Sequence, residues 1–226
     1  MDGKFSAILW RLPGERMTAE VLQHLSQVDV RLGTLIALVG PCELKPDSRR
    51  TPFQALIRAV AHQQLNGKAA NMILSRFIAL FPGSKFPSPE AVYDVDMGKL
   101  TGIGFSRAKA SYVKEIARAT LDGLLPGRKE LEHMADEEIV ERLTQIKGIG
   151  RWSVEMFLIF SLGRPDVFPV HDFGVQQGFA IVYNKRKLPK PDQLLKHGEQ
   201  WRPYRTTAAW YFWRAADLKK SKKLAV

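Results

Sequence analysis

Hydrophobic residues along the chain recur mainly at the three- and four-residue spacing that places them on one face of an α-helix. A first clear helix begins at Thr51-Pro52, a capping residue followed by the proline that helices accept in their first turn, and its apolar face continues to Ala61. The pattern restarts after Asn66-Gly67 and stops at Pro82-Gly83. Few stretches alternate between apolar and polar residues, so the pattern predicts helices and hardly any strands.

Three later segments show the same helical spacing. Residues 113–121 form an amphipathic pattern that Gly123 closes. Asp136 can cap a short helix that runs through Leu143. Residues 152–162 are apolar nearly all round, which predicts a helix in the interior of the fold.

The order of these elements predicts an all-α protein. A further helix is expected to begin at Asp172, and the last one carries Trp213. We assign residues 51–220 to one helical core, residues 1–50 to an N-terminal helical segment that packs on it, and residues 221–226 to a basic tail.

Composition and charge narrow the class of protein. Of the 226 residues, 45% are hydrophobic and 25% are charged, which argues against disorder. The formal net charge of +11 indicates a polyanionic partner, such as nucleic acid or an anionic membrane surface. No stretch approaches the roughly 20 apolar residues of a membrane span, and the N-terminus lacks the apolar core of a signal peptide. We expect a cytoplasmic, nucleoid-associated protein if the source is bacterial and a nuclear one if it is eukaryotic.

The chain contains a single cysteine, Cys42. One cysteine excludes an internal disulfide framework, a multi-cysteine zinc site and a four-cysteine iron–sulfur cluster. No cofactor is therefore expected to take part in catalysis.

Two short segments repeat one pattern: Leu100-Thr-Gly-Ile-Gly104 and Ile146-Lys-Gly-Ile-Gly150, each between two predicted helices. Glycines permit the positive φ of a tight turn and bring the backbone close to a ligand. The turn exposes N–H groups at the start of the next helix, where a DNA phosphate is favoured without any sequence readout. For one copy alone a plain linker between two helices is the favoured interpretation, but two copies in a basic chain favour a helix-hairpin-helix nucleic-acid binder.

The second hairpin is followed by a loop that ends in Val167-Phe-Pro-Val-His-Asp172. This combination resembles the signature of the helix-hairpin-helix DNA glycosylase superfamily. Within it, Arg151-Trp152 and Trp201-Arg-Pro-Tyr-Arg205 are most similar to the alkylpurine glycosylases of the AlkA, or 3-methyladenine II, type. The resemblance covers roughly residues 51–217 and implies two helical lobes with a cleft between them. Residues 1–50 stand where the bacterial prototype has a larger β-containing domain, so the chain resembles the compact form of the family.

The resemblance places Asp172 at the position of the essential aspartate. Spacing alone favours a plain N-cap, since an aspartate before a helix accepts backbone N–H bonds. The two roles are compatible, because a cap fixes the orientation of the carboxylate. A carboxylate beside the sugar stabilises the oxocarbenium-like charge that develops when an N-glycosidic bond breaks, and it can activate the attacking water. His171 adjoins it but is given low weight as a base.

The residue two positions after the last glycine of the second hairpin is Trp152. In the related bifunctional enzymes a lysine amine at this position attacks the sugar as a Schiff-base nucleophile. Lys147 lies inside the turn and is read as a phosphate or solvent contact. The resemblance therefore implies a monofunctional hydrolase that leaves an abasic site.

Aromatic residues supply the expected base pocket: Trp152, Phe173, Tyr211 and Trp213. By resemblance, Trp152 and Trp213 face the extruded base. A methylated purine is cationic, and an indole face attracts such a cation with about 0.5–2 kcal/mol. Aromatic residues on helices are more often core, an alternative that applies to Tyr211 above all.

Gln63 to Asn66 lie at a predicted helix end, a suitable place for a wedge that fills the space left by a flipped nucleotide. We assign intercalation to Leu65 and minor-groove contacts with the opposite strand to Gln64 or Asn66. A buried residue at the helix end is nearly as compatible with the pattern at Leu65.

The second hairpin supplies the expected phosphate contacts: Lys147, Gly148, Gly150 and Arg151. In related hairpins, backbone carbonyls hold a structural monovalent cation, Na⁺ or K⁺, that bridges to DNA. The corresponding positions are Thr144, Ile146 and Ile149.

The leading hypothesis is a base-excision DNA repair enzyme that removes alkylated bases from double-stranded DNA and acts as a monomer. Its expected substrates are 3-methyladenine and 7-methylguanine, with 1-methyladenine and 3-methylcytosine as an open extension. One alternative is a non-catalytic helix-hairpin-helix module that binds damaged or distorted DNA. A helix-turn-helix transcription regulator is a third reading, which the two hairpins disfavour.

Overall fold

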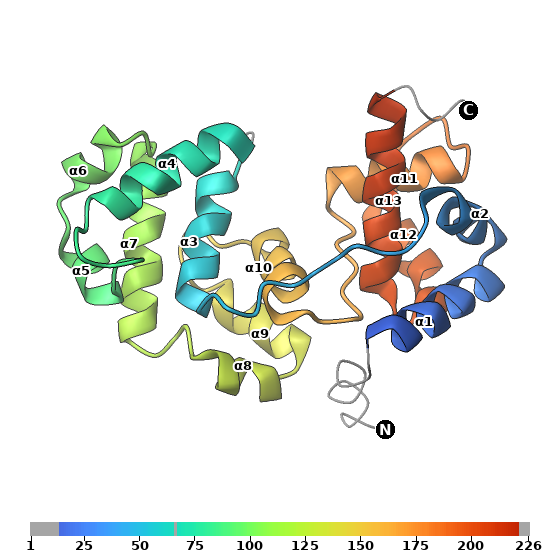
Figure 1. The fold of residues 1–226 in the computed structure, drawn as a ribbon, viewed down its shortest axis with the longest axis horizontal. Helices are drawn as coiled ribbons and strands as arrows, with labels where there is room; N and C mark the ends of the chain where they lie inside the picture. The colour runs from blue at the N-terminus through green and yellow to red at the C-terminus, as the bar shows by residue number, and fades with distance from the viewer. Residues whose placement is uncertain (1–13, 66, 222–226) are drawn as a thin grey trace. The chain divides into compact units, whose positions relative to one another are not determined.

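The structure, a computed structural model, describes residues 14–65 and 67–221 (Figure 1). Every regular element in these ranges is helical, which confirms the predicted all-α class. None of the described helices is both long and apolar enough to cross a membrane. Residues 1–13, Asn66 and residues 222–226 lie outside the described part, and with them most of the predicted basic tail.

The chain forms two compact units. The central unit is Pro46–Leu162, and the terminal unit combines the chain up to Lys45 with the chain from Gly163 onward. The sequence pattern predicts one helical core over residues 51–220, whereas the structure divides that stretch between the two units. The reason is that the helices after Gly163 pack on the N-terminal helices and share one core with them.

The central unit contains eight described α-helices and a π-helical turn, η1. Their bounds are α3 (Pro52–His62), α4 (Gly67–Ala79), α5 (Pro89–Asp94), α6 (Met97–Gly102), α7 (Arg107–Leu121), α8 (Arg128–His133), α9 (Asp136–Leu143), α10 (Arg151–Phe157) and η1 (Leu158–Leu162). α3 packs against α4, α7 and α10, while α5 and α6 cover α7. The helices beside the two hairpins therefore pack on α3 and α7: α6 contacts α7, and α10 contacts α3.

Local chemistry explains where these helices begin and end. Thr51 and Gln54 form a reciprocal capping box at the start of α3, as the Thr51-Pro52 pattern predicts. α7 ends before Gly123, which takes a φ of +75° as the predicted helix stop requires. Asp136 is the first helical residue of α9 rather than its cap, and Ala135 occupies the N-cap position.

The predicted helix over residues 152–162 is divided between α10 and η1. Arg128, from α8, donates to the Ser161 carbonyl (2.9 Å) and to the Ser161 hydroxyl (3.1 Å) at the end of the π-helical turn. The same guanidinium donates to the Arg50 carbonyl at 3.0 Å, just before α3. These contacts satisfy polar groups at the end of η1 with a partner far away in sequence.

The terminal unit is centred on the contact between its helices α11 and α13 (Figure 1). Its elements are α1 (Gly14–Val28), α2 (Val30–Val39), α11 (Phe173–Val182), α12 (Pro191–Gly198), the 3₁₀ turn η2 (Glu199–Trp201) and α13 (Arg205–Lys220). A Cβ atom on Gly178 of α11 would lie 1.9 Å from the Phe212 carbonyl oxygen of α13. The two backbones therefore touch at this point, and only glycine fits.

A buried carboxylate joins the N-terminal helices to the rest of the terminal unit. Asp29 caps α2 by accepting from the Leu32 N–H at 3.0 Å. Its other oxygen accepts from the Tyr183 hydroxyl and, at 3.0 Å, from the Trp201 indole, and lies 3.6 Å from Nε2 of His197. Burial alone would raise the pKa of Asp29, but His197, Tyr183, Leu32 and Trp201 together hold it well below its usual range.

We expect Asp29→Asn to lower the free energy of unfolding by about 2–3 kcal/mol at pH 7, because it weakens hydrogen bonds to a buried charge. The folded pKa of Asp29 is depressed, so its contribution is complete above the unfolded value of about 3.9 and is lost as pH falls further. The difference between parent and variant should shrink as the pH is lowered from 5 towards 3. Urea unfolding across this range measures it.

Asp192→Asn is the matched control, since Asp192 is an exposed aspartate in the first turn of α12 in the same unit. This control should change stability by less than about 0.5 kcal/mol. An Asp29→Asn effect that stays constant down to pH 3 would contradict the conclusion that the ionised Asp29 carboxylate stabilises the fold.

Candidate active site and nucleic-acid interface

The second hairpin lies between α9 and α10 as a tight turn. The Ile149 N–H donates to the Ile146 carbonyl at 3.0 Å, and both side chains are buried. Gly148 takes a φ of +89°, and a Cβ atom there would lie 2.1 Å from Cγ of Tyr112 on α7. Glycine is therefore required twice at this position, for its backbone conformation and for the ring that packs against it.

The two hairpin repeats differ at the helix that follows. Ser106 caps α7 after the first repeat by accepting from the Lys109 N–H at 3.2 Å. α10 follows the second repeat with Gly150 at its N-cap position and no side-chain cap. The first repeat is also covered by α4, where Arg76 contacts the Ile103 carbonyl. Of the two, the second repeat has the more open helix start.

The charged side chains at the second hairpin have different surroundings. Lys147 is exposed within the turn. Arg151 pairs with Glu137 of α9 through both carboxylate oxygens, a contact that holds the pKa of Glu137 below its usual range. A phosphate would meet Lys147 directly, whereas Arg151 would first have to exchange its carboxylate partner.

The predicted wedge segment follows the last turn of α3. Gln64 has a φ of +55°, an uncommon backbone conformation for a residue with a side chain. Leu65 is 39% exposed, which the alternative of a buried residue at the helix end does not fit. Asn66 lies outside the described residues.

Asp172 is the N-cap of α11, as the spacing predicts. Its Oδ1 accepts from the Val175 N–H at 2.9 Å and from the Trp213 indole N–H at 2.8 Å. A Cβ atom on Gly174 would lie 2.8 Å from Cδ1 of Trp213 and 3.1 Å from that carboxylate oxygen. The bare backbone of Gly174 thus lets α13 bring Trp213 against the Asp172 carboxylate, and two donors fix its orientation.

The predicted pocket aromatics have different positions. Phe173 follows Asp172 and is 61% exposed, and Trp152 in the first turn of α10 is 40% exposed. Trp213 is partly buried and contacts Asp172 through its indole nitrogen. Tyr211 is fully buried and its hydroxyl donates to the Gly40 carbonyl at 2.8 Å, so in the described structure it is a core residue of the terminal unit.

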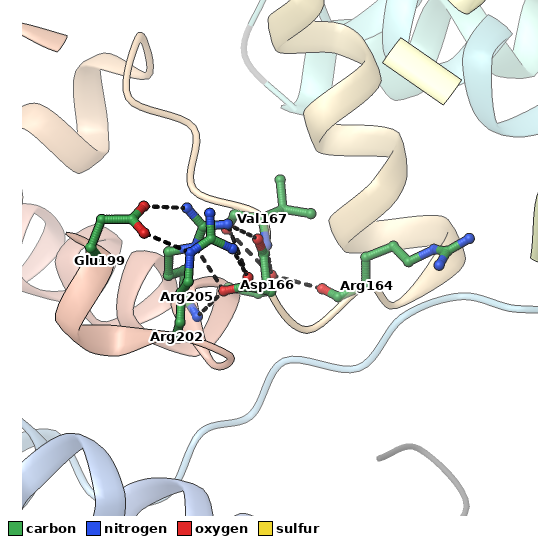
Figure 2. Close-up of polar contacts among 7 residues, drawn as sticks. Arg164, Asp166, Val167, Glu199, Arg202 and Arg205 are labelled. Carbon is green, nitrogen blue, oxygen red and sulfur yellow. Dashed lines mark hydrogen bonds and ion pairs between the residues drawn. The ribbon is translucent and has the colours of Figure 1, made fainter. Parts of the chain in front are cut away.

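The segment that leads to Asp172 is held by the first residues of α13, which sequence analysis did not assign to the site (Figure 2). The Arg205 guanidinium donates to both carboxylate oxygens of Asp166, at 2.7 and 2.9 Å, and to its backbone carbonyl at 2.9 Å. Thr206 accepts from the Val167 N–H at 2.9 Å and donates to the Arg164 carbonyl at 2.7 Å. In the sequence, Arg205 stands out only as the last residue of the Trp201–Arg205 motif, which carries the family resemblance and does not predict these hydrogen bonds.

Within each unit, the structure brings some of the candidate residues together. In the terminal unit Trp213 of α13 contacts Asp172 at the start of α11, where Phe173 is the next residue. In the central unit Gln63, which precedes the wedge residues, contacts the second hairpin through its side-chain amide at the Gly148 carbonyl, 3.3 Å away. Among the described residues there is no cluster of three or more histidine, cysteine or acidic side chains suited to a metal ion.

The described part of the chain is all helical, with a helix-hairpin-helix turn before α10 and a capping aspartate at the start of α11. The family model described as HhH-GPD superfamily base excision DNA repair protein matches residues 57–203. The chain belongs to this family.

Individual relatives match most of the chain. DNA-3-methyladenine glycosylase 1 of Schizosaccharomyces pombe is 45% identical over 198 residues, which cover 86% of either protein. The solved structure of S. pombe 3-methyladenine DNA glycosylase (Mag1) in complex with abasic DNA superimposes with a TM-score of 0.79 at 44% identity, covering 91% of this chain and 98% of that one. The structure of a Bacillus halodurans DNA-3-methyladenine glycosidase gives the same TM-score at 35% identity, covering 89% and 91%.

We expect Arg205→Lys to destabilise the terminal unit by about 2–4 kcal/mol, because a lysine cannot reproduce the paired contacts and leaves Asp166 without them. Arg202→Lys is the matched control. Arg202 contacts the same carboxylate from a position that is 48% exposed, so its loss should cost less than about 1 kcal/mol. Urea unfolding of the full chain measures both changes in stability. Equal effects would refute the conclusion that Arg205 is the main stabilising partner of Asp166.

Proposed function

We propose that this chain is a DNA glycosylase that hydrolyses the N-glycosidic bond of alkylated bases in base excision repair and leaves an abasic site. Its membership of the family and its 45% identity to a protein named DNA-3-methyladenine glycosylase support this function. The observation that carries it is the Asp172 carboxylate, held in one orientation by Val175 and Trp213 beside the exposed ring of Phe173.

The proposed chemistry needs one carboxylate and a good leaving group. Breaking the bond leaves positive charge on the sugar, and Asp172 stabilises that charge and orients or deprotonates the attacking water. A purine methylated at N3 or N7 is already cationic, so it departs without a strong general acid. Phe173 of the terminal unit is proposed to contact the base, since its ring is exposed next to Asp172. A stacking role for Trp152 stays a sequence-based prediction.

Duplex DNA is the proposed partner, with 3-methyladenine and 7-methylguanine as the first substrates. The net charge of +11 suits a polyanion, and the S. pombe relative was solved with abasic DNA. Gly148, Gly150 and Lys147 are the proposed phosphate contacts at the second hairpin. The protein is proposed to act as a monomer wherever the DNA is kept, in the nucleoid or the nucleus.

A structural Na⁺ or K⁺ at the second hairpin is part of the proposal. The expected ligands are the backbone carbonyls of Thr144, Ile146 and Ile149, all in or beside one turn. Carbonyl oxygens suit such a hard cation, and Ile146 keeps a second lone pair beyond the one that accepts from Ile149. The ion would bridge the turn to DNA and has no catalytic role.

The test incubates the protein with methylated duplex DNA and identifies free bases by chromatography. The parent should release 3-methyladenine and 7-methylguanine, and Asp172→Asn should reduce the rate by about 100- to 1000-fold while DNA binding is kept. Asparagine caps a helix as well as aspartate, so the fold should survive.

Asp96→Asn is the matched control, since Asp96 caps α6 by accepting from two backbone N–H groups. It should leave base release unchanged within about twofold. A parent that binds methylated DNA but releases no base would instead establish the non-catalytic module.

The absence of a lysine two residues after Gly150 predicts that product strands are not cut. Treated duplexes should break only after alkali or heat, because the enzyme leaves an intact abasic site. Gel electrophoresis with and without alkali measures this. Spontaneous nicks, or a covalent adduct trapped by borohydride, would overturn the monofunctional assignment.

A further inference from the structure

The turn that carries the proposed wedge is held in an unusual backbone conformation. After α3 the Gln63 N–H still donates to the Ala59 carbonyl at 3.1 Å, but Gln64 then turns to a φ of +55°. The Leu65 N–H reaches back to the His62 carbonyl at 3.3 Å. A residue with a side chain keeps a positive φ only where its surroundings hold it, so contacts from outside the turn must contribute.

One such contact comes from α7. The Lys109 ammonium donates to the Ala61 carbonyl at 3.0 Å and to the Gln63 carbonyl at 2.6 Å, on either side of the end of α3. A cation at a helix C-terminus also meets the negative end of the helix dipole. Burial lowers the pKa of Lys109, because taking the ammonium partly out of water disfavours its charged form.

A second contact joins the turn to the second hairpin. The Gln63 side-chain amide donates to the Gly148 carbonyl and to the Ser153 hydroxyl, both at 3.3 Å. Gly148 in turn lies against Tyr112, one helical turn from Lys109 on α7. The helix that follows the first hairpin repeat therefore supports both the wedge turn and the second hairpin.

We propose that Lys109 and Gln63 are positioning residues that lock the wedge turn to the second hairpin, so that Leu65 enters the duplex at a set distance from the held phosphates. This inference rests on the proposed glycosylase function. It also gives the first hairpin repeat a role as an internal support of the interface. Neither residue touches the reacting atoms, and both act through the placement of Leu65.

The test compares a lesion that is base-paired, and must be unpaired before it can be flipped, with the same lesion in an unpaired position. Two duplexes carry 7-methylguanine, either opposite cytosine or opposite an abasic-site analogue. Lys109→Met keeps the aliphatic stem and removes the donor. It should lower kcat/KM on the paired lesion about tenfold and on the unpaired lesion less than about threefold, because an unpaired base costs less to flip.

Lys114→Met is the matched control. Lys114 also lies on α7 and donates to a carbonyl at a helix end, that of Val95 after α5, at 2.7 Å, but its contact is away from the wedge turn. It should leave both rates unchanged within about twofold. Gln63→Met removes the link to the hairpin while Lys109 stays in place, and it keeps the test open if Lys109→Met fails to fold. It should show the same selective loss on the paired lesion.

A double-mutant cycle with Leu65→Ala separates positioning from general stability. Once Leu65 is truncated, adding Lys109→Met should lower the paired-lesion rate by less than about twofold, since both changes remove the same function. An equal loss on the two duplexes, a fully additive cycle or no loss at all would overturn the inference. A parent that releases base from neither duplex would refute the glycosylase function itself, and the positioning role with it.

Discussion

The close approach of α11 and α13 is the constraint on which the candidate active site depends. At Gly178 the two backbones touch, with no room for even a methyl group. This contact sets the register in which Trp213 reaches the Asp172 carboxylate across the bare backbone of Gly174. A glycine needed for packing and a glycine needed for access to the carboxylate thus lie on the same short helix.

α13 of this helix pair also holds the segment that precedes Asp172. Arg205 and Thr206, at the start of α13, hydrogen-bond the stretch around Asp166 and Val167 that precedes Asp172. α13 therefore contributes at both ends of this segment, through Trp213 at the carboxylate and through Arg205 upstream of it. Rotational freedom in an aspartate side chain would weaken electrostatic stabilisation of a developing charge, and this arrangement removes it.

The two hairpin repeats of the central unit lead into helices that begin differently. The first leads into α7, whose start is capped by Ser106 and whose partly buried Lys109 and Tyr112 contact the end of α3 and Gly148. The second leads into α10, whose start carries no side-chain cap and leaves its N–H groups to other partners. The two copies of one motif therefore differ in how their following helices are capped and packed.

Much of the fold was accessible from the sequence because its signals are local. Helix starts at Thr51 and Asp172, the stop at Gly123 and the largely buried character of residues 153–161 all follow from capping chemistry and periodicity, although Trp152 and Phe160 are exposed. The six-residue helices α5 and α8 were missed, since so few residues show no clear period. The division of η1 from α10 was also missed, because Arg128 and Ser161, which meet at its end, are far apart in sequence.

The sequence by itself determined the all-helical class, the hairpin turns, the basic character and the position of the capping aspartate, since each depends on neighbouring residues or on counts. Only the tertiary structure decided that Tyr211 belongs to the core, that Trp213 hydrogen-bonds Asp172 and that Lys109 and Gln63 hold the wedge turn. Those outcomes depend on which helices meet and at what distance. These contacts join residues that are far apart in the sequence and arise from the packing of the whole chain, so no local sequence pattern predicts them.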